Sequence, residues 1–392
     1  MHIEIPEKPA AALAALEAAG LHAWAVGGAV RDALLGRTAA DWDITVAAQP
    51  AQLAAALPDA KPMGGVYGTV SWHGVEITPC RAEGGYSDHR HPDAVAFGTD
   101  LAADLARRDF TVNAMAWDGR TLTDPYGGQA DLQAKLLRCV GEPEIRFGED
   151  ALRIMRLYRF AGMLGFAIEE NTGAAARRLA PALAAVSAQR VRGELNKACH
   201  GARPSALAPL IAADGLTAFG FSGEALRTDP NALAPLDAVP DNLLCRWWAL
   251  FKLTKSDAYR AGRVFDFGRS FVKDFARMDA LYAAGCPADT HALKRLLMEP
   301  VPFSFADAAE TFAAVSPAFA SLPALYRALE KSGEPYRKEQ LAVTPAELLV
   351  EGIPGRKIGA VQQCLLKAVV DTPALNVYPT LAQMAKQLRG MV

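Results

Sequence analysis

Asp41 and Asp43, separated by one tryptophan, are the first candidates for chemistry in this sequence. They come directly before the apolar run 44–46, which is typical of a β-strand, and residues two apart in a strand point to the same side. Carboxylates this close raise one another's pKa unless a cation lies between them, and Mg²⁺, which prefers oxygen ligands, suits that position. An exposed turn with two solvated aspartates is the alternative. Glu76, on the predicted strand 75–78, is either a third carboxylate of this site or an ordinary cross-strand charge.

A glycine pair stands where a predicted strand gives way to a predicted helix. Gly27 and Gly28 follow the β-like run 22–26, and Arg31 comes within the first helical turn. Glycines let the backbone approach a ligand closely, and the amides of a helix N-terminus suit an anion. The pattern indicates a phosphate-binding turn to which Arg31 adds positive charge. A purely structural strand-to-helix turn is the alternative.

Basic and polar residues gather between positions 107 and 113, beside a helical apolar run. Arginine binds phosphate through paired hydrogen bonds, and aspartate and asparagine can bond ribose hydroxyls. The residues of this cluster are Arg107, Arg108, Asp109 and Asn113. The cluster suits a nucleotide, and a charged helix start with solvated arginines is the alternative.

Three arginines recur at every third position within residues 149–160, where nearly every other residue is apolar. They are Arg153, Arg156 and Arg159. This spacing places them in a slanting stripe on a helix that is otherwise expected to be buried. Arginines in such a setting need anionic partners, and a triphosphate is one solution. Internal pairing with Glu149, Asp150 or Glu142 is the alternative.

The scaffold predicted for these residues is an α+β head followed by helices. Short β-like runs alternate with glycine turns up to about residue 140, whereas the pattern beyond residue 149 is helical almost throughout. The predicted strands are 22–26, 44–46, 69–72 and 75–78. The polar stretch 81–98 is predicted to be a long loop, and 124–132 a strand end, turn and helix cap.

Composition limits the class of protein. The 392 residues carry 41 Lys and Arg against 43 Asp and Glu, and 51% of them are hydrophobic. Such a chain can bury the cores of about two to three domains. Its net charge of −2 excludes a uniformly basic nucleic-acid coat but leaves room for a local basic groove. We predict no membrane span and no secretory leader, and six scattered cysteines without a CxxC spacing indicate reduced thiols in a cytoplasmic protein.

Taken in order, five motifs resemble those of the class II tRNA nucleotidyltransferases, the bacterial CCA-adding enzymes and their poly(A) polymerase relatives. The motifs are GGAVRD, DWD, RRDFTVNAM, DPYGGQADL and EDALRIMR. The likeness covers roughly residues 20–200, and QRVRGEL at 189–195 looks like the family's last helical motif. It implies a polymerase-β-like nucleotidyltransferase head with a small mixed sheet at 1–140, then an all-α remainder. The implied helical parts are a neck at 141–205, a body at 206–290 and a tail at 291–392.

The resemblance also implies an activity. Enzymes of this family add CCA to the 3′ end of tRNA from CTP and ATP, without a nucleic-acid template, and release pyrophosphate. At matching positions, Asp41 and Asp43 would be catalytic and hold two Mg²⁺ ions, and Asp150 with Arg153 would read the incoming base. The other implied nucleotide-binding residues are Gly28, Arg31, Arg108, Asn113, Arg156 and Arg159.

Hydrogen-bond patterns explain why an aspartate and an arginine can read a base. Cytosine and adenine both present an amino donor beside a ring-nitrogen acceptor, which match a carboxylate and a guanidinium. Uracil and guanine present a keto oxygen and a ring N–H at those places, so buried groups would be left unpaired.

Two further segments are assigned by resemblance. Residues 86–92, with Val95 and Phe97, look like the family's flexible loop, which helps the switch from C to A and favours complete CCA addition. Residues 352–359 open a helical pattern where the family's tail binds tRNA, so Arg356 and Lys357 are expected to contact tRNA phosphates. A packing turn between two helices is the alternative for this segment.

Other functions remain compatible with the same core. A poly(A) polymerase or an A-adding tRNA nucleotidyltransferase would share it, although residues 47–60 lack the basic stretch of bacterial poly(A) polymerases. A catalytically silent RNA-binding protein is a third hypothesis, against which the intact Asp41 and Asp43 pair argues. The stretch 243–252 has no His-Asp pair, so we predict no phosphohydrolase domain.

Overall fold

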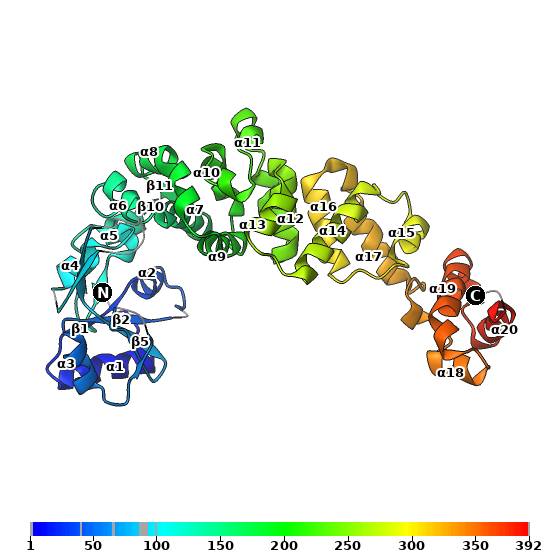
Figure 1. Cartoon of the computed structure of the whole chain (residues 1–392), viewed down its shortest axis with the longest axis horizontal. Helices are drawn as coiled ribbons and strands as arrows, with labels where there is room; N and C mark the ends of the chain where they lie inside the picture. Colours follow the sequence, from blue (N-terminus) through cyan, green and yellow to red (C-terminus); the bar gives the residue numbers. More distant parts are fainter. Residues whose placement is uncertain (1–2, 40, 65–66, 86–92, 99, 391–392) are drawn as a thin grey trace. The chain divides into compact units, whose positions relative to one another are not determined.

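The computed structural model describes residues 3–39, 41–64, 67–85, 93–98 and 100–390. The chain forms two compact units, Met1–Asn231 and Ala232–Val392. The named strands all lie between residues 23 and 168, and the described chain beyond them is built of helices and turns (Figure 1). The predicted α+β class, with a small mixed sheet in the N-terminal part, is confirmed.

The main sheet has seven strands in the order β3-β4-β5-β2-β1-β8-β9. The pair β2–β5 is parallel and the other neighbouring pairs are antiparallel, which makes the sheet mixed. The strands are β1 (Ala23–Val26), β2 (Asp43–Val46), β3 (Lys61–Pro62), β4 (Val70–Trp72), β5 (Val75–Pro79), β8 (Ala116–Trp117) and β9 (Leu122–Thr123). The four strands predicted from alternating hydrophobicity correspond to β1, β2, β4 and β5.

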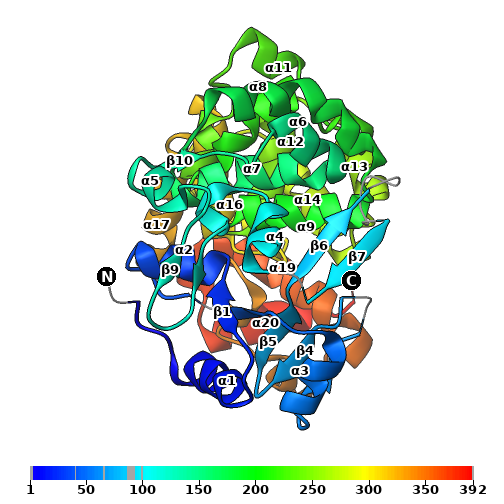
Figure 2. The same cartoon turned by 90° about the vertical axis from the view of Figure 1, so that its left-hand side faces the viewer.

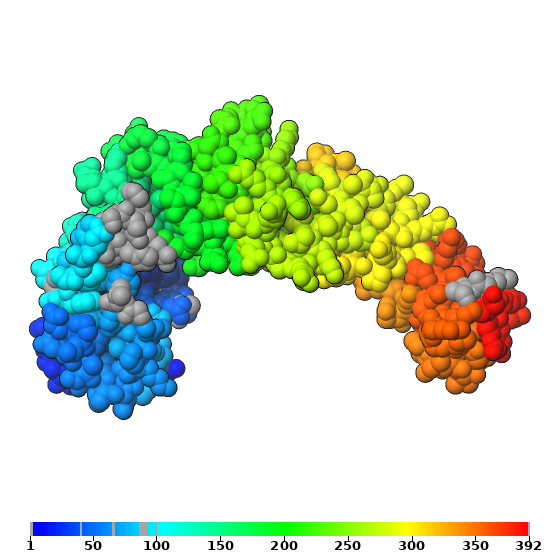
Figure 3. Space-filling view, in the orientation of Figure 1, coloured from blue at the N-terminus to red at the C-terminus, as the bar shows by residue number. Residues whose placement is uncertain are grey.

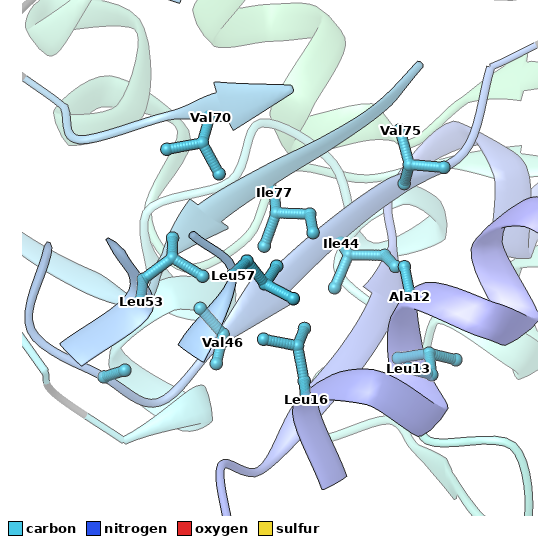
Figure 4. Close-up of a cluster of buried hydrophobic side chains, with 11 residues drawn as sticks. Ala12, Leu13, Leu16, Ile44, Val46, Leu53, Leu57, Val70, Val75 and Ile77 are labelled. Atoms are coloured by element: carbon cyan, nitrogen blue, oxygen red, sulfur yellow. The ribbon is translucent and has the colours of Figure 1, made fainter. Parts of the chain in front are cut away.

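One face of the sheet is sealed by helices α1 (Glu7–Ala18) and α3 (Pro50–Ala56), whose apolar side chains meet those of β2, β4 and β5 (Figure 4). Ile44 and Val46 point into this core and are almost fully buried. Side chains alternate along a strand, so Asp43 must lie on the opposite side. A slip of one residue would bury Asp43 and expose Ile44, and the core therefore fixes the position of the carboxylate.

The stretch 81–98 contains two strands, so the prediction of a long loop was wrong there. Strands β6 (Arg81–Gly84) and β7 (Ala94–Phe97) form an antiparallel ladder of their own. Neither strand has a fully buried residue, and the two pair with each other rather than with the main sheet, so the hydrophobic pattern of each segment does not reveal them. Val95 and Phe97 lie on β7, whereas residues 86–92 lie outside the described residues.

Four short elements complete the head around the sheet. They are helices α2 (Gly28–Leu34), α4 (Leu101–Ala106) and α5 (Gly128–Gln133) and the 3-10 turn η1 (Thr111–Asn113). The predicted turn and cap at 124–132 are confirmed, because the Asp124 carboxylate accepts hydrogen bonds from the amides of Gly128 and Gln129. The arginines at 107 and 108 follow α4 instead of starting a helix, which corrects the alternative considered for them.

The helical part of the first unit is tied to the head by a parallel pair of two-residue strands, β10 (Leu136–Leu137) and β11 (Ala167–Ile168). Helix α7 (Leu152–Leu164) carries the predicted arginine stripe and packs against α9 (Ala188–Cys199). The remaining helices of this unit are α6 (Pro143–Glu149), α8 (Glu170–Leu179), α10 (Ala208–Ala212) and α11 (Glu224–Thr228).

The second unit is helical throughout its described residues and has an aromatic core around Trp247 and Trp248. Its surface runs from yellow-green to red in Figure 3. Its helices are α12 (Leu243–Thr254), α13 (Ala258–Val264), α14 (Arg269–Ala283), α15 (Thr290–Leu297), α16 (Phe305–Val315), α17 (Leu322–Ser332), α18 (Pro345–Val350), α19 (Ile358–Asp371) and α20 (Tyr378–Leu388). In the described part of the chain, no helix has the length and apolar character needed to cross a membrane. All six cysteines are free thiols.

Candidate active site

Three carboxylates line one open cavity of about 650 Å³ where the central strands β2 and β5 of the main sheet begin. Asp43 is the first residue of β2, and its partner in the parallel register on β5 is Glu76. Asp41 precedes the strand, so the argument from strand alternation applies to Asp43 alone, yet Asp41 lines the same cavity. The sequence therefore led to the three acidic residues, and the register explains how Glu76 joins the other two.

The electrostatics of this group suit a bound cation. Removal from water raises the pKa of the Asp43 carboxyl, the charges of Glu76 and Asp41 raise it further, and Arg108 lowers it. Oxygen donors of this kind are what a hard divalent cation prefers, and a cation here would relieve the repulsion. Within the described residues, no three acidic, histidine or cysteine side chains already stand close enough to enclose a metal by themselves. The carboxylates of Asp41, Asp43 and Glu76 fit a divalent cation by the chemistry of their oxygen donors.

The predicted glycine turn directly follows Val26, which pairs with Asp43 across β1 and β2, so the turn lies beside the start of β2. Gly27 adopts φ +74, a left-handed conformation that favours glycine, and Gly28 begins the seven-residue helix α2. A Cβ atom placed on Gly27 would lie 3.2 Å from Nη1 of Arg108. The guanidinium of Arg108 therefore reaches over the turn, so two motifs separated by about eighty residues meet in space.

Arg31 is buried and already engaged. Its Nε and Nη2 each donate to the carboxylate of Asp32 at 2.9 Å, and its Nη1 donates to Oδ1 of Asn113 at 2.7 Å. Asn113 in turn donates to Oδ1 of Asp109 at 3.1 Å. Arg31 and Asn113, both predicted to bind nucleotide, thus support one another in the interior, behind the residues that reach the surface.

Asp109 links the head to helix α7. Its Oδ2 accepts hydrogen bonds from Arg156, with Nη2 at 2.6 Å and Nε at 2.8 Å, and its Oδ1 accepts one from the amide of Phe110. Burial alone would raise the pKa of this carboxyl, but the charge of Arg156 and the hydrogen bonds outweigh it and lower the pKa to about 2. Asp109 is therefore ionised at any pH near neutrality.

Asp109→Asn is expected to destabilise the fold by about 2 kcal/mol near neutral pH, as the depressed pKa implies. A carboxyl whose pKa is lowered on folding contributes stability above its unfolded pKa of about 4 and loses it as the pH falls toward about 2. Urea unfolding should thus show a difference from the wild type that shrinks in acid. Asp214→Asn is the control, since the exposed Asp214–Arg227 pair contributes at most about 1 kcal/mol and asparagine tolerates the positive φ there. A constant difference at every pH would contradict the ionic role.

The ring of Phe160 lies against three guanidinium groups. Their carbon atoms lie 3.9 Å (Arg159), 5.1 Å (Arg31) and 5.3 Å (Arg156) from the ring centre. Each of these arginines also has an acidic partner, and for Arg159 it is Glu194 on α9, whose Oε2 lies 2.5 Å from Nε. Burial lowers the pKa of Arg159, and Glu194 opposes that effect. Sequence reasoning missed Phe160 and Glu194, although Glu194 stood in a recognised motif.

The two predicted base-reading residues stand at the start of α7 with separate partners. Oδ2 of Asp150 accepts from Nη2 of Arg190 at 2.7 Å, and Oδ1 accepts from the amide of Leu152 at 3.0 Å. Arg153 donates through Nη1 to Oε2 of Glu149 at 2.5 Å, as the internal-pairing alternative predicted. Arg156 and Arg159 pair instead with Asp109 and Glu194, acids that alternative did not include.

Arg356 and Lys357 belong to the second compact unit, in the short 3-10 turn Gly355–Lys357 before α19. The ammonium of Lys357 donates to the carbonyl of Arg389 at 3.1 Å. Neither residue is buried. The turn holds two basic side chains next to each other, as the predicted phosphate contact requires.

Comparisons with known proteins show the family to which the chain belongs. A family model described as the poly A polymerase head domain matches residues 23–138, and one described as a probable RNA and SrmB-binding site of polymerase A matches residues 165–223. The CCA-adding enzyme of Lacticaseibacillus paracasei is 34% identical over 397 residues, which cover 95% of this chain and 94% of that protein. The chain belongs to the CCA-adding enzyme family. The class II tRNA nucleotidyltransferase family suggested by the five motifs is thereby confirmed.

Other members of the CCA-adding enzyme family match more strongly over less of the chain. The Geobacillus thermodenitrificans enzyme is 43% identical over 205 residues, 51% of this chain and 51% of that protein, so the chain spans about half the length of such curated relatives. The crystal structure of the Bacillus stearothermophilus CCA-adding enzyme in complex with CTP is 28% identical, with a TM-score of 0.73 and 99% of both chains covered. The Thermotoga maritima CCA-adding enzyme complexed with tRNA, 20% identical with a TM-score of 0.66, shares the fold. Nucleotidyltransferases of this kind depend in general on a divalent metal.

Proposed function

We propose that this protein adds cytidine, cytidine and adenosine to the 3′ end of tRNA, using CTP and ATP without a template and releasing pyrophosphate. The observation that carries the proposal is the set of three carboxylates beside a glycine turn that Arg108 covers. In a chain similar from end to end to CCA-adding enzymes, this set is suited to nucleotidyl transfer. The free cysteines and the substrates both fit the cytoplasm as the place of action.

Asp41 and Asp43 are the proposed metal ligands, and Mg²⁺ is the proposed metal. A divalent cation bound there would make the tRNA 3′-hydroxyl a better nucleophile and neutralise charge on the departing pyrophosphate. In the reaction the 3′ oxygen bonds to the α-phosphorus, its proton passes to solvent, and the bond to the oxygen of the β-phosphate breaks to release pyrophosphate. Glu76, opposite Asp43 in the register, adds to the negative field that attracts the cation.

Arginines hold the triphosphate in this proposal. Arg108 reaches over the turn at Gly27 and Gly28, and Arg156 keeps about a third of its side chain exposed, so each can offer a donor to a phosphate oxygen. Arg31 and Asn113 fix the position of Asp109 and through it that of Arg156. Arg159, which Glu194 and Phe160 hold in place, supports the same helix from inside.

Asp150 and Arg153 are the proposed readers of the base. The carboxylate accepts a hydrogen bond from the amino group of cytosine or adenine, and the guanidinium donates to the adjacent ring nitrogen. Both side chains are only partly buried and lie at the start of one helix, so an incoming base can reach them together. Arg356 and Lys357 are the proposed tRNA contacts, and sequence-independent phosphate binding by them would weaken as salt rises.

The decisive experiment gives the purified chain a tRNA that lacks its 3′ end, together with CTP, ATP or both, and sequences the products. CTP alone should add two residues, and both nucleotides should complete CCA and then stop. Addition of A only to a tRNA already ending in CC, or of a run of A, would replace the proposal with the A-adding or poly(A) alternative. No addition under any condition would favour the silent RNA-binding scaffold.

A further inference from the structure

Among the described acids of the head, Asp104 has the least exposed side chain. It lies in helix α4, which runs beside β6 (Figure 2). Its side chain has no exposed surface. A buried carboxylate is costly unless charged donors surround it, and such a group usually holds its partners in place. The partners of Asp104 therefore indicate which residues it holds in place.

Two consecutive arginines share this carboxylate. Oδ1 of Asp104 accepts from Nη2 of Arg107 at 2.6 Å and from its Nε at 3.1 Å, while Oδ2 accepts from Nη2 of Arg108 at 2.9 Å. The backbone amide of Arg81, at the start of β6, also lies 3.4 Å from Oδ1. Burial alone would raise the pKa of Asp104, but the charges of Arg108 and Arg107 lower it, so the carboxylate is ionised.

Arg108 is one of the residues that Asp104 positions. The carboxylate holds Nη2, whereas Nη1 points to the glycine turn, 3.2 Å from where a Cβ of Gly27 would lie. Nε of Arg108 is buried and has no hydrogen-bond partner among the described residues, which hold this side chain through its outer nitrogens. A guanidinium fixed at one end can present its other donors to a phosphate without losing further side-chain entropy.

Arg107 connects the same acid to the base-reading helix. Its carbonyl oxygen accepts a hydrogen bond from Nη2 of Arg153 at 3.0 Å. Arg107 directly follows α4 as its C-cap residue. Its side chain folds back onto Asp104, and Glu83 is a second acidic partner at 3.4 Å. The carbonyl that orients Arg153 is therefore held by the side-chain pairing of its own residue.

We propose that Asp104 is a positioning and specificity-determining residue. It holds Arg108 in position to bind the triphosphate and, through Arg107, holds Arg153 in position to bind the base. This inference rests on the proposed function. It joins phosphate binding and base selection in one buried carboxylate that touches neither the nucleotide nor the metal. Both properties should consequently change when this single charge is removed.

Asp104→Asn tests the proposal because it keeps the shape of the side chain and removes its charge. With a tRNA lacking CCA, KM for CTP should rise roughly 10- to 100-fold, the effect of losing a charged hydrogen bond. The preference for CTP over UTP should fall by a similar factor. Arg107→Gln is the second variant, with the Asp104–Arg108 pair intact. It should lower the preference for CTP over UTP. KM for CTP should change by less than about threefold, a smaller effect than the loss of one charged hydrogen bond produces.

Asp100→Ala is the matched control. Asp100 caps the N-terminus of the same helix, accepting from the amide of Ala103 at 2.9 Å, and touches neither arginine. It should loosen α4 and lower the melting temperature without changing the CTP to UTP ratio. Equal selectivity in Asp104→Asn and the wild type, or an equal loss in Asp100→Ala, would overturn the inference. A wild-type chain that adds no nucleotide would instead count against the proposed function. If Asp104→Asn does not fold, Arg107→Gln provides the test. A preference for CTP over UTP equal to that of the wild type would then overturn the inference.

Discussion

Asp43→Asn is expected to abolish nucleotide addition while leaving tRNA binding nearly unchanged. The asparagine keeps the shape of the side chain but removes the charge that faces Glu76 and attracts the cation. Several kcal/mol of charge stabilisation depend on such a ligand, which corresponds to a loss of roughly 1,000-fold or more in kcat. Single-turnover incorporation of labelled CTP gives the rate, and a filter-binding titration gives the affinity for tRNA.

The same substitution should leave the fold as stable as before, or make it more stable. The pKa of Asp43 is raised in the folded state, so its carboxylate destabilises that state at every pH above the ordinary pKa of the group. Removing the charge relieves this cost near neutral pH, and the melting temperature should stay level or rise. Asp59→Asn, at an exposed acid in the same head, is the control and should retain full activity. An active Asp43→Asn enzyme would refute the proposed metal role.

Arg153→Ala is expected to reduce the preference for CTP over UTP roughly 10- to 100-fold, the range for one charged hydrogen bond. Without the guanidinium, the ring nitrogen of cytosine loses its donor and the ring N–H of uracil loses the group that repels it. Sequencing of tRNA products made with CTP and UTP in competition measures the ratio. Asp150→Ala should also reduce the preference for CTP over UTP, because it removes the acceptor for the amino group of cytosine.

Arg153 also holds the carbonyls of Arg107 and Arg146, so a control for helix packing is needed. Arg178→Ala removes an exposed arginine that pairs with Glu144 in the same unit, and it should leave the CTP to UTP ratio unchanged. Thermal melting separates a loss of selectivity from a loss of structure. Unaltered selectivity in both Arg153→Ala and Asp150→Ala would remove the protein-template hypothesis.

The fold could be predicted from the sequence where one face of an element is buried. The apolar run 44–46 indicated β2, and the burial of Ile44 and Val46 in the structure then fixes the side on which Asp43 lies. Strands β6 and β7 gave no such signal, since neither has a fully buried residue. Their pairing is a property of two segments together, which a reading of each segment alone misses.

Partners that are distant in the chain were likewise beyond the sequence. The acids of Arg156 and Arg159 are Asp109 and Glu194, 47 and 35 residues away, and nothing local connects them. Asp104 is different, because Arg107 and Arg108 follow it at i+3 and i+4, the spacing at which helical side chains meet. The spacing of Asp104, Arg107 and Arg108 is therefore a local signal from which this pairing could be predicted.

The arrangement around Phe160 has a consequence for how a nucleotide is received. Arg31, Arg156 and Arg159 meet Asp32, Asp109 and Glu194, three positive charges against three negative ones. The charges around Phe160 therefore cancel one another before a nucleotide binds. A polyanion would be attracted by the few exposed donors that remain rather than by a strong net positive charge. If the chain carries out the proposed reaction, such a site would let pyrophosphate leave readily after each of the three additions to one tRNA.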